Sequence, residues 1–545
     1  MALSPDGSRL IVVNTPDNSI EIFSVRSNTL VRLSSVPVGM EPVAVAMRNN
    51  SEVWVVNHLS DSVSIVSLSP VARVVRTLKV GDEPRDIVFA GPGNGRAFIA
   101  AANRQVTQKE INPGRQNGAA DVWVFDAANP GSSLFGNPLA VINLFSDVAR
   151  ALAVSPNGNT VYAAAFQSGN QTTVVSGAIV QNNGLPPFAT ADGVTAPRQG
   201  LIVKYDGQVW RDAGNRDWSA NVGISLPDWD VFAIDAAAAV PAEIAHTPSV
   251  GTILFNMAVN PVSGKLYVSN LESLNHIRFE GPGITGGSTV RGHMVDNRIT
   301  VIDGTTVTPR DLNKHIDYSV FPGTPDENAK SLALPLQMAV SSNGETLYVA
   351  AFGSSKIGIF STVELENGSF IPDVARHIEV AGGGPSGVVL DEAHNKLYVL
   401  KRFTNSVGII DLATNREIRE FALFNPEPPQ VVNGRSILYD ARHTSSRGNS
   451  ACGSCHIFGD TDHLAWDLGN PDGQVVNNPN PLRTNLFPLL AELDFHPMKG
   501  PMTTQSLRGM ANNGPLHWRG DRSGGNEPEA DPMNVRASFK TFRVA

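Results

Sequence analysis

The sequence predicts a mainly β fold, in which a seven-bladed β-propeller is followed by a small, mainly α domain. The prediction rests on the composition, on a strand pattern repeated through residues 1–420, and on the abrupt end of that pattern. Only 17% of the 545 residues are charged, whereas glycine and proline number 49 and 37. Such a composition is typical of many short strands joined by turns.

The repeated pattern is a short apolar strand, a turn rich in Pro, Asn, Asp and Gly, a second apolar strand ending in a small polar residue, and a third strand after a loop. Its seven copies have their second strands near residues 10–14, 53–57, 97–100, 161–164, 266–270, 347–350 and 397–400. A spacing of roughly 40–50 residues between most copies is the period of propeller blades. An array of β-sandwiches is the alternative architecture.

The first copy and three of the later copies depart from the common pattern. The chain starts within the innermost strand expected for the first blade, so we expect an outer strand of that blade to be missing or supplied from the C-terminal side. Loops are inserted near 104–119, 167–228 and 271–296, each between a second and a third strand. In a propeller these connections emerge on one face, and loops often carry function. We therefore expect a docking or substrate surface there.

The strand pattern stops after residues 411–414. A proline-rich stretch marks residues 421–433 as a linker. Residues 434–545 are then expected to form a separate domain, with a short amphipathic helix over 434–441. Because the sequence stops in the middle of a pattern, we expect this domain to continue beyond Ala545.

Both cysteines of the chain lie in the run Cys452-Gly453-Ser454-Cys455-His456, which is the C-x-x-C-H signature of covalent c-type haem attachment. Each thiol can add to one haem vinyl group, and the adjacent imidazole can become an axial ligand of the iron. A zinc site completed by His456, His463 or His496 is one alternative. A structural disulfide is another. A thioredoxin-like pair would need a strand before it, where the sequence has a loop. Haem c is the interpretation we favour.

The second axial ligand is expected downstream of the motif. Thioether ligation raises the reduction potential and suits electron transfer, whereas an open site would allow peroxide chemistry. Met502 lies in a proline-rich loop pattern with little helical periodicity and is the favoured ligand. The alternatives are Met498, His463, His496 and His517. It also remains open that both methionines only line the pocket.

Two resemblances add to these inferences. Residues 1–420 resemble the YVTN family of seven-bladed propellers. The stretches 500–509 and 514–521, together with Cys452 to His456, resemble the bacterial di-haem cytochrome c peroxidases and methylamine-utilisation di-haem proteins over roughly residues 430–525. The second resemblance implies covalent haem ligation by Cys452, Cys455 and His456. Those relatives carry two C-x-x-C-H motifs and this chain has one, so either a second haem domain follows Ala545 or the protein is a mono-haem relative.

Three further residues are candidates for contact with the haem. A guanidinium pairs well with a carboxylate, so Arg508 and Arg519 are expected near the haem propionates. A surface salt bridge to Asp521 is the simpler alternative for either arginine. Trp518 is expected either to stack near the haem or to fill the core of the domain.

Charge and hydropathy limit the partners. The net charge is −9 and no basic stripe is present, which argues against nucleic-acid binding. No apolar run approaches the ~20 residues of a membrane-spanning helix. Because haem c is attached outside the cytoplasm, we expect a periplasmic or otherwise extracytoplasmic protein whose leader is absent from the given sequence.

The expected function is electron transfer by a covalently bound haem, with the propeller as a docking scaffold. The expected partner is a redox protein or a small electron donor or acceptor. One alternative is a di-haem, peroxidase-like oxidoreductase whose second haem domain is missing. Another is a surface-binding protein in which the propeller is the functional part. No catalytic residue can be named from the sequence.

Overall fold

The computed structural model describes residues 1–104, 118–183, 193–281, 289–290, 292–477, 494–510 and 534. The chain divides into two compact units. The first, here called the sheet unit, comprises Met1–Asn170, Pro227–Ser273 and Val295–Ser454. The second, the hairpin unit, comprises Gln171–Leu226, Leu274–Met294 and Cys455–Ala545.

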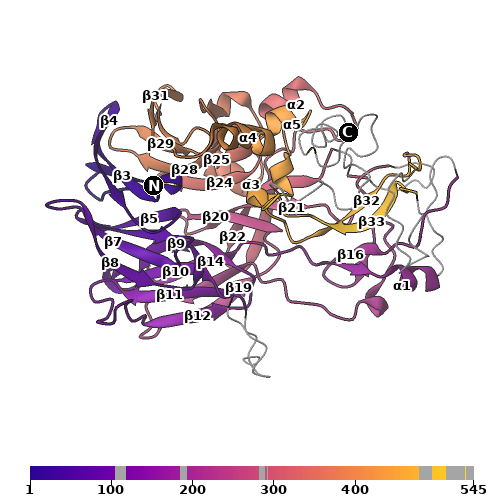
Figure 1. Ribbon diagram of the computed structural model, residues 1–545, viewed down its shortest axis with the longest axis horizontal. Helices are drawn as coiled ribbons and strands as arrows, with labels where there is room; N and C mark the ends of the chain where they lie inside the picture. Colours follow the sequence, from indigo (N-terminus) through magenta and orange to yellow (C-terminus); the bar gives the residue numbers. More distant parts are fainter. Residues whose placement is uncertain are drawn as a thin grey trace. The chain divides into compact units, whose positions relative to one another are not determined.

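The described part of the sheet unit contains seven four-stranded antiparallel sheets, so the prediction of a mainly β chain is confirmed (Figure 1). The first sheet consists of β1 (Ala2–Leu3), β2 (Arg9–Asn14), β3 (Ser19–Arg26) and β4 (Thr29–Pro37). The second consists of β5 (Pro42–Asn49), β6 (Glu52–Asn57), β7 (Ser62–Ser67) and β8 (Arg73–Lys79). The third consists of β9 (Asp82–Ala90), β10 (Arg96–Ala102), β11 (Ala120–Asp126) and β12 (Ala140–Leu144). The fourth is β13 (Ala149–Val154), β14 (Thr160–Ala165), β18 (Val231–Asp235) and β19 (Ala242–Thr247). The last three are β20 (Ile253–Val259), β21 (Leu266–Ser273), β22 (Val295–Asp303) and β23 (Thr306–Asp311); β24 (Pro335–Val340), β25 (Thr346–Ala351), β26 (Lys356–Ser361) and β27 (His377–Glu379); and β28 (Pro385–Asp391), β29 (Lys396–Lys401), β30 (Ser406–Asp411) and β31 (Arg416–Ala422).

Position within a sheet explains the residue pattern of each strand. The second strands, such as β2 with the sequence RLIVVN, are buried over nearly their whole length, and therefore read as continuous apolar runs. The outer strands, such as β8, alternate between exposed and partly buried residues. Turns between strands use left-handed residues, for example Gly7 at φ 68°. Glycine adopts this backbone conformation without steric cost.

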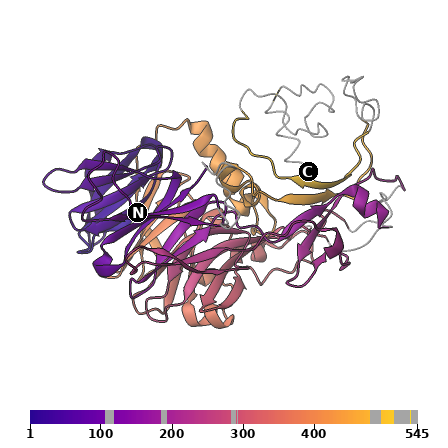
Figure 2. The same ribbon diagram turned by 90° about the horizontal axis from the view of Figure 1, so that it is seen from below.

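Seven apolar clusters fill the spaces between consecutive sheets. One cluster joins the first and second sheets, the cluster around Trp54 and Phe125 joins the second and third, and each following pair up to the seventh sheet shares a cluster of its own. One further cluster joins Leu10 and Phe23 of the first sheet to Tyr398 and Val407 of the last. In both ribbon views the last sheet, coloured orange, lies beside the first, coloured indigo (Figures 1 and 2).

Buried hydrogen bonds also join the first and last sheets. Asn405 Nδ2 donates to Asn14 Oδ1 at 3.0 Å, and Asn14 Nδ2 donates to the Phe424 carbonyl at 2.9 Å. The expectation about the first blade is wrong: its outer strand is β4, contributed by residues directly after β3. The innermost strand β1 is only two residues long, which is why the copy looked incomplete from the sequence.

The α-helices of the sheet unit are α2 (Pro325–Lys330), α3 (Thr362–Asn367), α4 (Pro429–Tyr439) and α5 (Ala441–Thr444). A capping box stabilises the start of α2, because the Glu327 N–H donates to Thr324 Oγ1 while the Thr324 N–H donates to Glu327 Oε2. The helix expected over 434–441 starts earlier than predicted, at Pro429. Proline suits the first turn of a helix, and the residues assigned to a linker therefore include the first half of α4.

The hairpin unit has its own elements: α1 (Gly177–Asn182), a three-stranded sheet of β15 (Thr172–Val175), β16 (Leu201–Tyr205) and β17 (Trp210–Arg211), and a hairpin of β32 (Ala465–Gly469) and β33 (Met498–Thr503). After the cysteine motif, the described residues hold this hairpin and a short 3-10 turn, Ile457–Gly459. The predicted mainly α domain is therefore not what these residues form. Pro497, Gly500 and Pro501 lie within or beside β33, and such residues disfavour a helix interior.

Candidate functional site

The division of the chain into two units falls within the cysteine motif. The boundary falls between Ser454 and Cys455, so Cys452 belongs to the sheet unit and His456 to the hairpin unit. Figure 1 shows α4 and α5, which lead into the motif, in orange.

Buried side chains of the sheet unit hold the segment that leads to Cys452. Asn297, which is 0% exposed, donates from Nδ2 to the Asn449 carbonyl at 2.7 Å, and Ser331 Oγ donates to the Arg447 carbonyl at 2.7 Å. The Asn297 amide oxygen in turn accepts the Leu334 N–H at 2.8 Å. These bonds satisfy buried polar groups on both sides and fix the path of the backbone.

The glycine of the motif packs against an aromatic cluster. A Cβ atom at Gly453 would collide with the ring of Tyr439, the last residue of α4. That ring has its centroid 5.1 Å from the Phe352 ring and 6.4 Å from the Phe403 ring. Residue 453 must therefore be small for the 3-10 turn Cys452–Ser454 to reach its place beside α4.

The two cysteines of the motif differ in exposure. Neither takes part in a disulfide; Cys452 is exposed and Cys455 is partly buried. Desolvation by burial raises the pKa of the Cys452 thiol, although the residue as a whole remains exposed. The motif therefore presents a protonated thiol at Cys452 at neutral pH.

The His456 ring has the tautomer that a metal ligand requires. Its Nδ1 lies 2.8 Å from the carbonyl oxygen of Gln505, and because a carbonyl only accepts, Nδ1 carries the hydrogen. The ring is partly exposed, and its Nε2 makes no hydrogen bond within the described part of the chain. An Nδ1–H···O=C bond that leaves the Nε2 lone pair available is the usual arrangement of a metal-bound histidine.

The Gln505 carbonyl is itself fixed by neighbouring hydrogen bonds. The Leu507 N–H donates to the Gly459 carbonyl at 3.0 Å, and the Thr504 N–H donates to the Leu464 carbonyl at 3.2 Å. Residues 504–507 therefore run beside residues 456–464. This contact could not be predicted from the sequence, because a backbone carbonyl has no residue-specific signature.

Arg508, a candidate partner of a propionate, forms a surface ion pair. Its Nη1 lies 3.1 Å from Asp460 Oδ2, and its side chain is largely exposed. An exposed pair of this kind contributes little to stability, so the guanidinium can exchange partners at small cost. The other propionate candidate, Arg519, lies outside the described residues, as do Trp518, expected to stack near the haem or fill the core, and His517.

The two methionines on β33 have different environments. Met498 is 2% exposed, and its Sδ lies 3.3 Å from the position of a Cβ on Gly469, inside the hairpin. Met502 pairs across the hairpin with Trp466 and is partly exposed. Met498 therefore serves as core, whereas Met502 keeps an accessible thioether.

The two described histidine candidates also differ. His496 is 7% exposed; its Nδ1 accepts the Met498 N–H at 3.1 Å, and its Nε2 donates to the Val194 carbonyl at 3.3 Å. With both ring nitrogens bonded, His496 is a structural residue. His463 is exposed and has a left-handed backbone, with φ 59°.

The inserted segments pack against the hairpin that carries Met502. Asn275 Nδ2 donates to Thr172 Oγ1 and to the Ala465 carbonyl, both at 2.9 Å, and thereby joins two insertions to β32. The Phe279 N–H donates to the Asp467 carbonyl at 2.7 Å. Most of the insertions near 167–228 and 271–296 thus belongs to the same compact unit as His456, whereas the insertion near 104–119 belongs to the sheet unit and lies largely outside the described residues.

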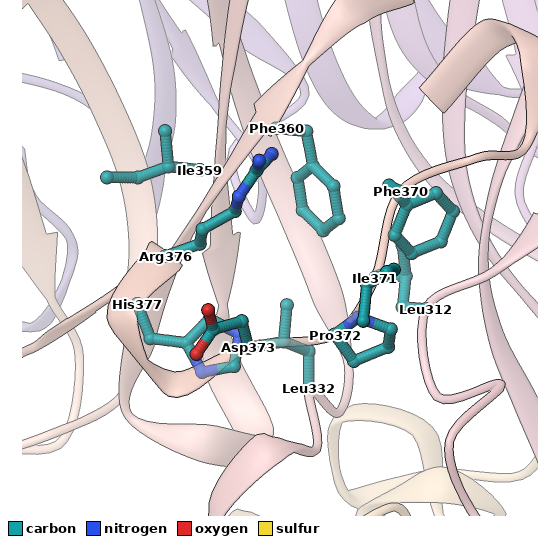
Figure 3. A pocket seen from close by; sticks show the side chains of 10 residues that line it. All are labelled: Leu312, Leu332, Ile359, Phe360, Phe370, Ile371, Pro372, Asp373, Arg376 and His377. Atoms are coloured by element: carbon teal, nitrogen blue, oxygen red, sulfur yellow. The ribbon is translucent and has the colours of Figure 1, made fainter. Parts of the chain in front are cut away.

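A small pocket elsewhere in the sheet unit has no catalytic arrangement. It lies beside β26 and the loop before β27, and Figure 3 shows mainly apolar side chains around it, with Arg376, Asp373 and His377. Arg376 Nη1 is paired with Glu364 Oε2 at 2.5 Å. Burial lowers the pKa of His377 to about 4, so the imidazole is neutral at physiological pH.

The described residues hold neither a preformed metal cluster nor a membrane-spanning helix. They contain no group of three or more His, Cys, Asp or Glu side chains placed to hold a metal ion. No helix among them is long and apolar enough to cross a membrane.

Comparisons with known proteins give only distant similarity. No protein-family model matches the chain, and no curated protein sequence does. Among solved structures, hydrazine synthase of Kuenenia stuttgartiensis is 18% identical, with a TM-score of 0.49 over 75% of this chain and 94% of that chain. A protein of unknown function from Desulfotomaculum acetoxidans is 14% identical, with a TM-score of 0.45 over 76% of this chain and 95% of that chain. Because both TM-scores are below 0.5, neither likeness supports an argument about this chain.

Proposed function

We propose that the chain is an extracytoplasmic c-type cytochrome that binds one haem covalently and transfers electrons. The observation that carries the proposal is the state of His456: its Nδ1–H is held by the Gln505 carbonyl, and its Nε2 is left for iron. Two thiols outside any disulfide stand four and one residues before it, at the spacing that haem attachment needs. When bound, haem would supply one-electron chemistry at this place.

The chain's own residues would set the properties of the site. Cys452 and Cys455 would hold the group through two thioether bonds, and the Gln505 carbonyl would orient the His456 ring and raise its basicity. Met502 is the favoured second ligand, because Met498 lies inside the hairpin and His496 has both ring nitrogens bonded. Arg508 would be the propionate partner among the described residues.

We further propose that the seven sheets are the blades of a β-propeller. Support comes from the apolar cluster and the asparagine pair that join the last sheet to the first. A closed ring has no exposed edge strand between blades, and its rigid loops suit the docking of a redox partner. Haem c attachment takes place outside the cytoplasm, so the proposal places the protein there.

The decisive experiment is a pyridine haemochrome spectrum, with a haem-to-protein ratio, on the complete gene product expressed with a c-type haem attachment system. We expect one covalent haem for this chain. Absence of covalent haem would refute the proposal, and two haems would favour the di-haem oxidoreductase. A ferrous spectrum that carbon monoxide does not alter would support a six-coordinate haem that only transfers electrons. Rapid binding of carbon monoxide would favour an open site suited to peroxide chemistry.

A further inference from the structure

The outer strands β4 and β8 of the first two sheets present apolar side chains to solvent. The two strands contact each other. Their exposed apolar residues are Val31 and Leu33 on β4 and Val75 on β8, with Val71 in the turn before β8. Single exposed aliphatic residues are ordinary on a protein surface, whereas a group of them on adjoining elements indicates a binding surface.

A bulge in each of these strands affects how the surface can be used. Leu33 is left out of the pairing of β4 with β3, and Val75 is left out of the pairing of β8 with β7. Bulges in edge strands hinder the addition of a further strand. Backbone pairing with another polypeptide is therefore disfavoured at this edge, although the apolar side chains are exposed.

A loop of the third sheet adds two more apolar side chains beside β8. Leu134 and Phe135, between β11 and β12, are 81% and 54% exposed. The Phe135 carbonyl accepts the Lys79 N–H at 3.1 Å, and the Ser133 carbonyl accepts a hydrogen bond from Arg76 Nη2 at 3.0 Å. Three consecutive sheets thus contribute to one apolar surface, here called the outer surface, which consists of Val31, Leu33, Val71, Val75, Leu134 and Phe135.

The segments that form the outer surface carry only positive charge. Residues 24–37, 69–80 and 127–139 contain no acidic residue, although the net charge of the chain is −9; their basic residues are Arg26, Arg32, Arg73, Arg76 and Lys79. Arg32 is paired with Glu21, with Nε 2.6 Å from Oε2. The other four cations are exposed or partly exposed, and no acidic side chain among the described residues forms an ion pair with them.

This combination fits the surface of an anionic bilayer. Lysine and arginine are attracted to anionic headgroups, while aliphatic and phenyl groups enter the boundary between headgroups and acyl chains. The loop with Leu134 and Phe135 suits insertion, because residues 127–139 contain no charged side chain that would have to be desolvated. A protein partner that adds a strand is disfavoured by the two bulges.

We propose that the outer surface binds an anionic lipid bilayer peripherally, with Leu134 and Phe135 inserted among the headgroups and the cations against the lipid phosphates. The proposal goes beyond electron transfer, since it assigns the sheet unit a role in membrane attachment. It also stands independently of haem binding, because every residue in it belongs to the sheet unit.

Co-sedimentation of the full chain with lipid vesicles tests the proposal. We expect binding to vesicles of phosphatidylglycerol mixed with phosphatidylcholine, and little binding to phosphatidylcholine alone. Added salt should weaken binding to the mixed vesicles, because exposed charges are screened. The double variant Arg73→Gln/Lys79→Gln should weaken that binding about thirtyfold, and Leu134→Ser/Phe135→Ser should weaken it by about tenfold or more.

Two double variants outside the outer surface are the matched controls. Lys314→Gln/Lys330→Gln removes two positive charges from the segment between β23 and β24. Val262→Ser/Ile371→Ser replaces two exposed apolar side chains, one in a loop of the fifth sheet and one in a loop of the sixth. Both controls should bind the mixed vesicles like the wild type.

The proposal is overturned if the wild-type chain binds neither kind of vesicle, or binds both equally. It is also overturned if both outer-surface variants, shown by circular dichroism to keep their sheets, lose no more binding than the controls. Sedimentation velocity without lipid tests a second copy as the occupant: a dimer that only the outer-surface variants abolish, without vesicle binding, would overturn lipid binding. If one variant does not fold, the wild-type comparison and the other variant decide the question.

Discussion

Each unit has buried apolar clusters of its own, but the contacts between segments distant in sequence differ within the two units. Consecutive sheets share buried apolar clusters, and the last cluster joins the first sheet to the seventh. In the hairpin unit, segments far apart in sequence are joined through side-chain and backbone hydrogen bonds, such as those of Asn275 to Thr172 and Ala465. Apolar burial is non-directional, whereas hydrogen bonds fix individual atoms. The sheet unit and the segments of the hairpin unit that position His456 should therefore respond differently to mutation.

The largest expected effect separates the cofactor from the scaffold. The double variant Cys452→Ala/Cys455→Ala should lose all covalent haem, because both thioether bonds are removed. Its far-UV circular dichroism should stay β-rich, since neither thiol forms a disulfide in the sheet unit or the hairpin unit. Haem staining of a denaturing gel measures the first effect. His443→Ala, at an exposed position in the same leading segment, is the control that should keep its haem. Covalent haem in the double variant would contradict the prediction.

The next effect tests the scaffold. Trp54 is 0% exposed, and its ring meets Phe89 edge-on with centroids 5.6 Å apart. Trp54→Ala should lower the free energy of unfolding by about 3–5 kcal/mol, because it leaves a cavity between two sheets. Urea unfolding followed by circular dichroism measures the change. Val31→Ala, on the exposed face of β4, should change it by less than about 0.5 kcal/mol. Similar losses in both variants would mean that the clusters do not carry the stability.

A smaller effect concerns the segment that leads to the motif. Asn297→Ala removes the donor to the Asn449 carbonyl and the acceptor of the Leu334 N–H, both buried. We expect a loss of about 1–3 kcal/mol, because buried polar groups are left unpaired. We also expect faster hydrogen exchange at residues 447–454. Asn313→Ala, which breaks two similar bonds to Leu332, is a matched control that should leave exchange in this segment unchanged. Equal exchange in the two variants would show that Asn297 does not anchor the motif.

The contrast between apolar burial in the sheet unit and individual hydrogen bonds in the hairpin unit explains which features can be predicted from the sequence. Strands such as β6, with the sequence EVWVVN, are buried between neighbouring sheets, so their apolar runs and the repetition of these runs can be recognised in the sequence. The motif from Cys452 to His456 can be recognised because the residues that would bind the haem are close together in the sequence. The hydrogen bond between His456 and the Gln505 carbonyl cannot be predicted from the sequence, because any residue could provide a backbone carbonyl. Asn275 was missed for a related reason: its two partners are distant in sequence, and no periodicity marks them.

The described residues after the cysteine motif form a β-hairpin where helices were predicted, and this difference also has a physical cause. The resemblance to cytochromes favoured helices after the motif, but the local sequence contains Gly500 and Pro501 within β33. Gly500 has φ 70°, a conformation that favours glycine, and the hairpin register shifts nearby between Asp467 and Gly469. Family resemblance was thus a weaker guide to this segment than its glycines and prolines.

The smallest expected effect contrasts two acids, one in each unit. In the sheet unit, burial first and the nearby charge of Asp228 raise the pKa of Asp230 to about 8. In the hairpin unit, the N–H of Val209 and the side chain of Arg211 lower the pKa of Asp206 to about 2. Between pH 4 and 8 the folded chain keeps a proton on Asp230 that the unfolded chain has lost. The free energy of unfolding attributable to Asp230 therefore falls as the pH rises through this range.

Asp230→Asn should remove that dependence, because an amide cannot lose the proton and can still accept the Val250 N–H that bonds Asp230 Oδ2. The difference between the wild type and Asp230→Asn should change by up to about 1.4 kcal/mol per pH unit, with the variant relatively more stable at pH 8. Urea unfolding of both chains between pH 6 and 8 measures it; the titration of Asp86 near pH 6 cancels in the difference, because both chains carry that residue. Asp206→Asn is the control, since Asp206 is ionised in both states throughout this range and its curve should stay parallel to that of the wild type. Parallel curves for Asp230→Asn as well would show that Asp230 is ionised in the folded chain, and that burial does not distinguish the acids of the two units.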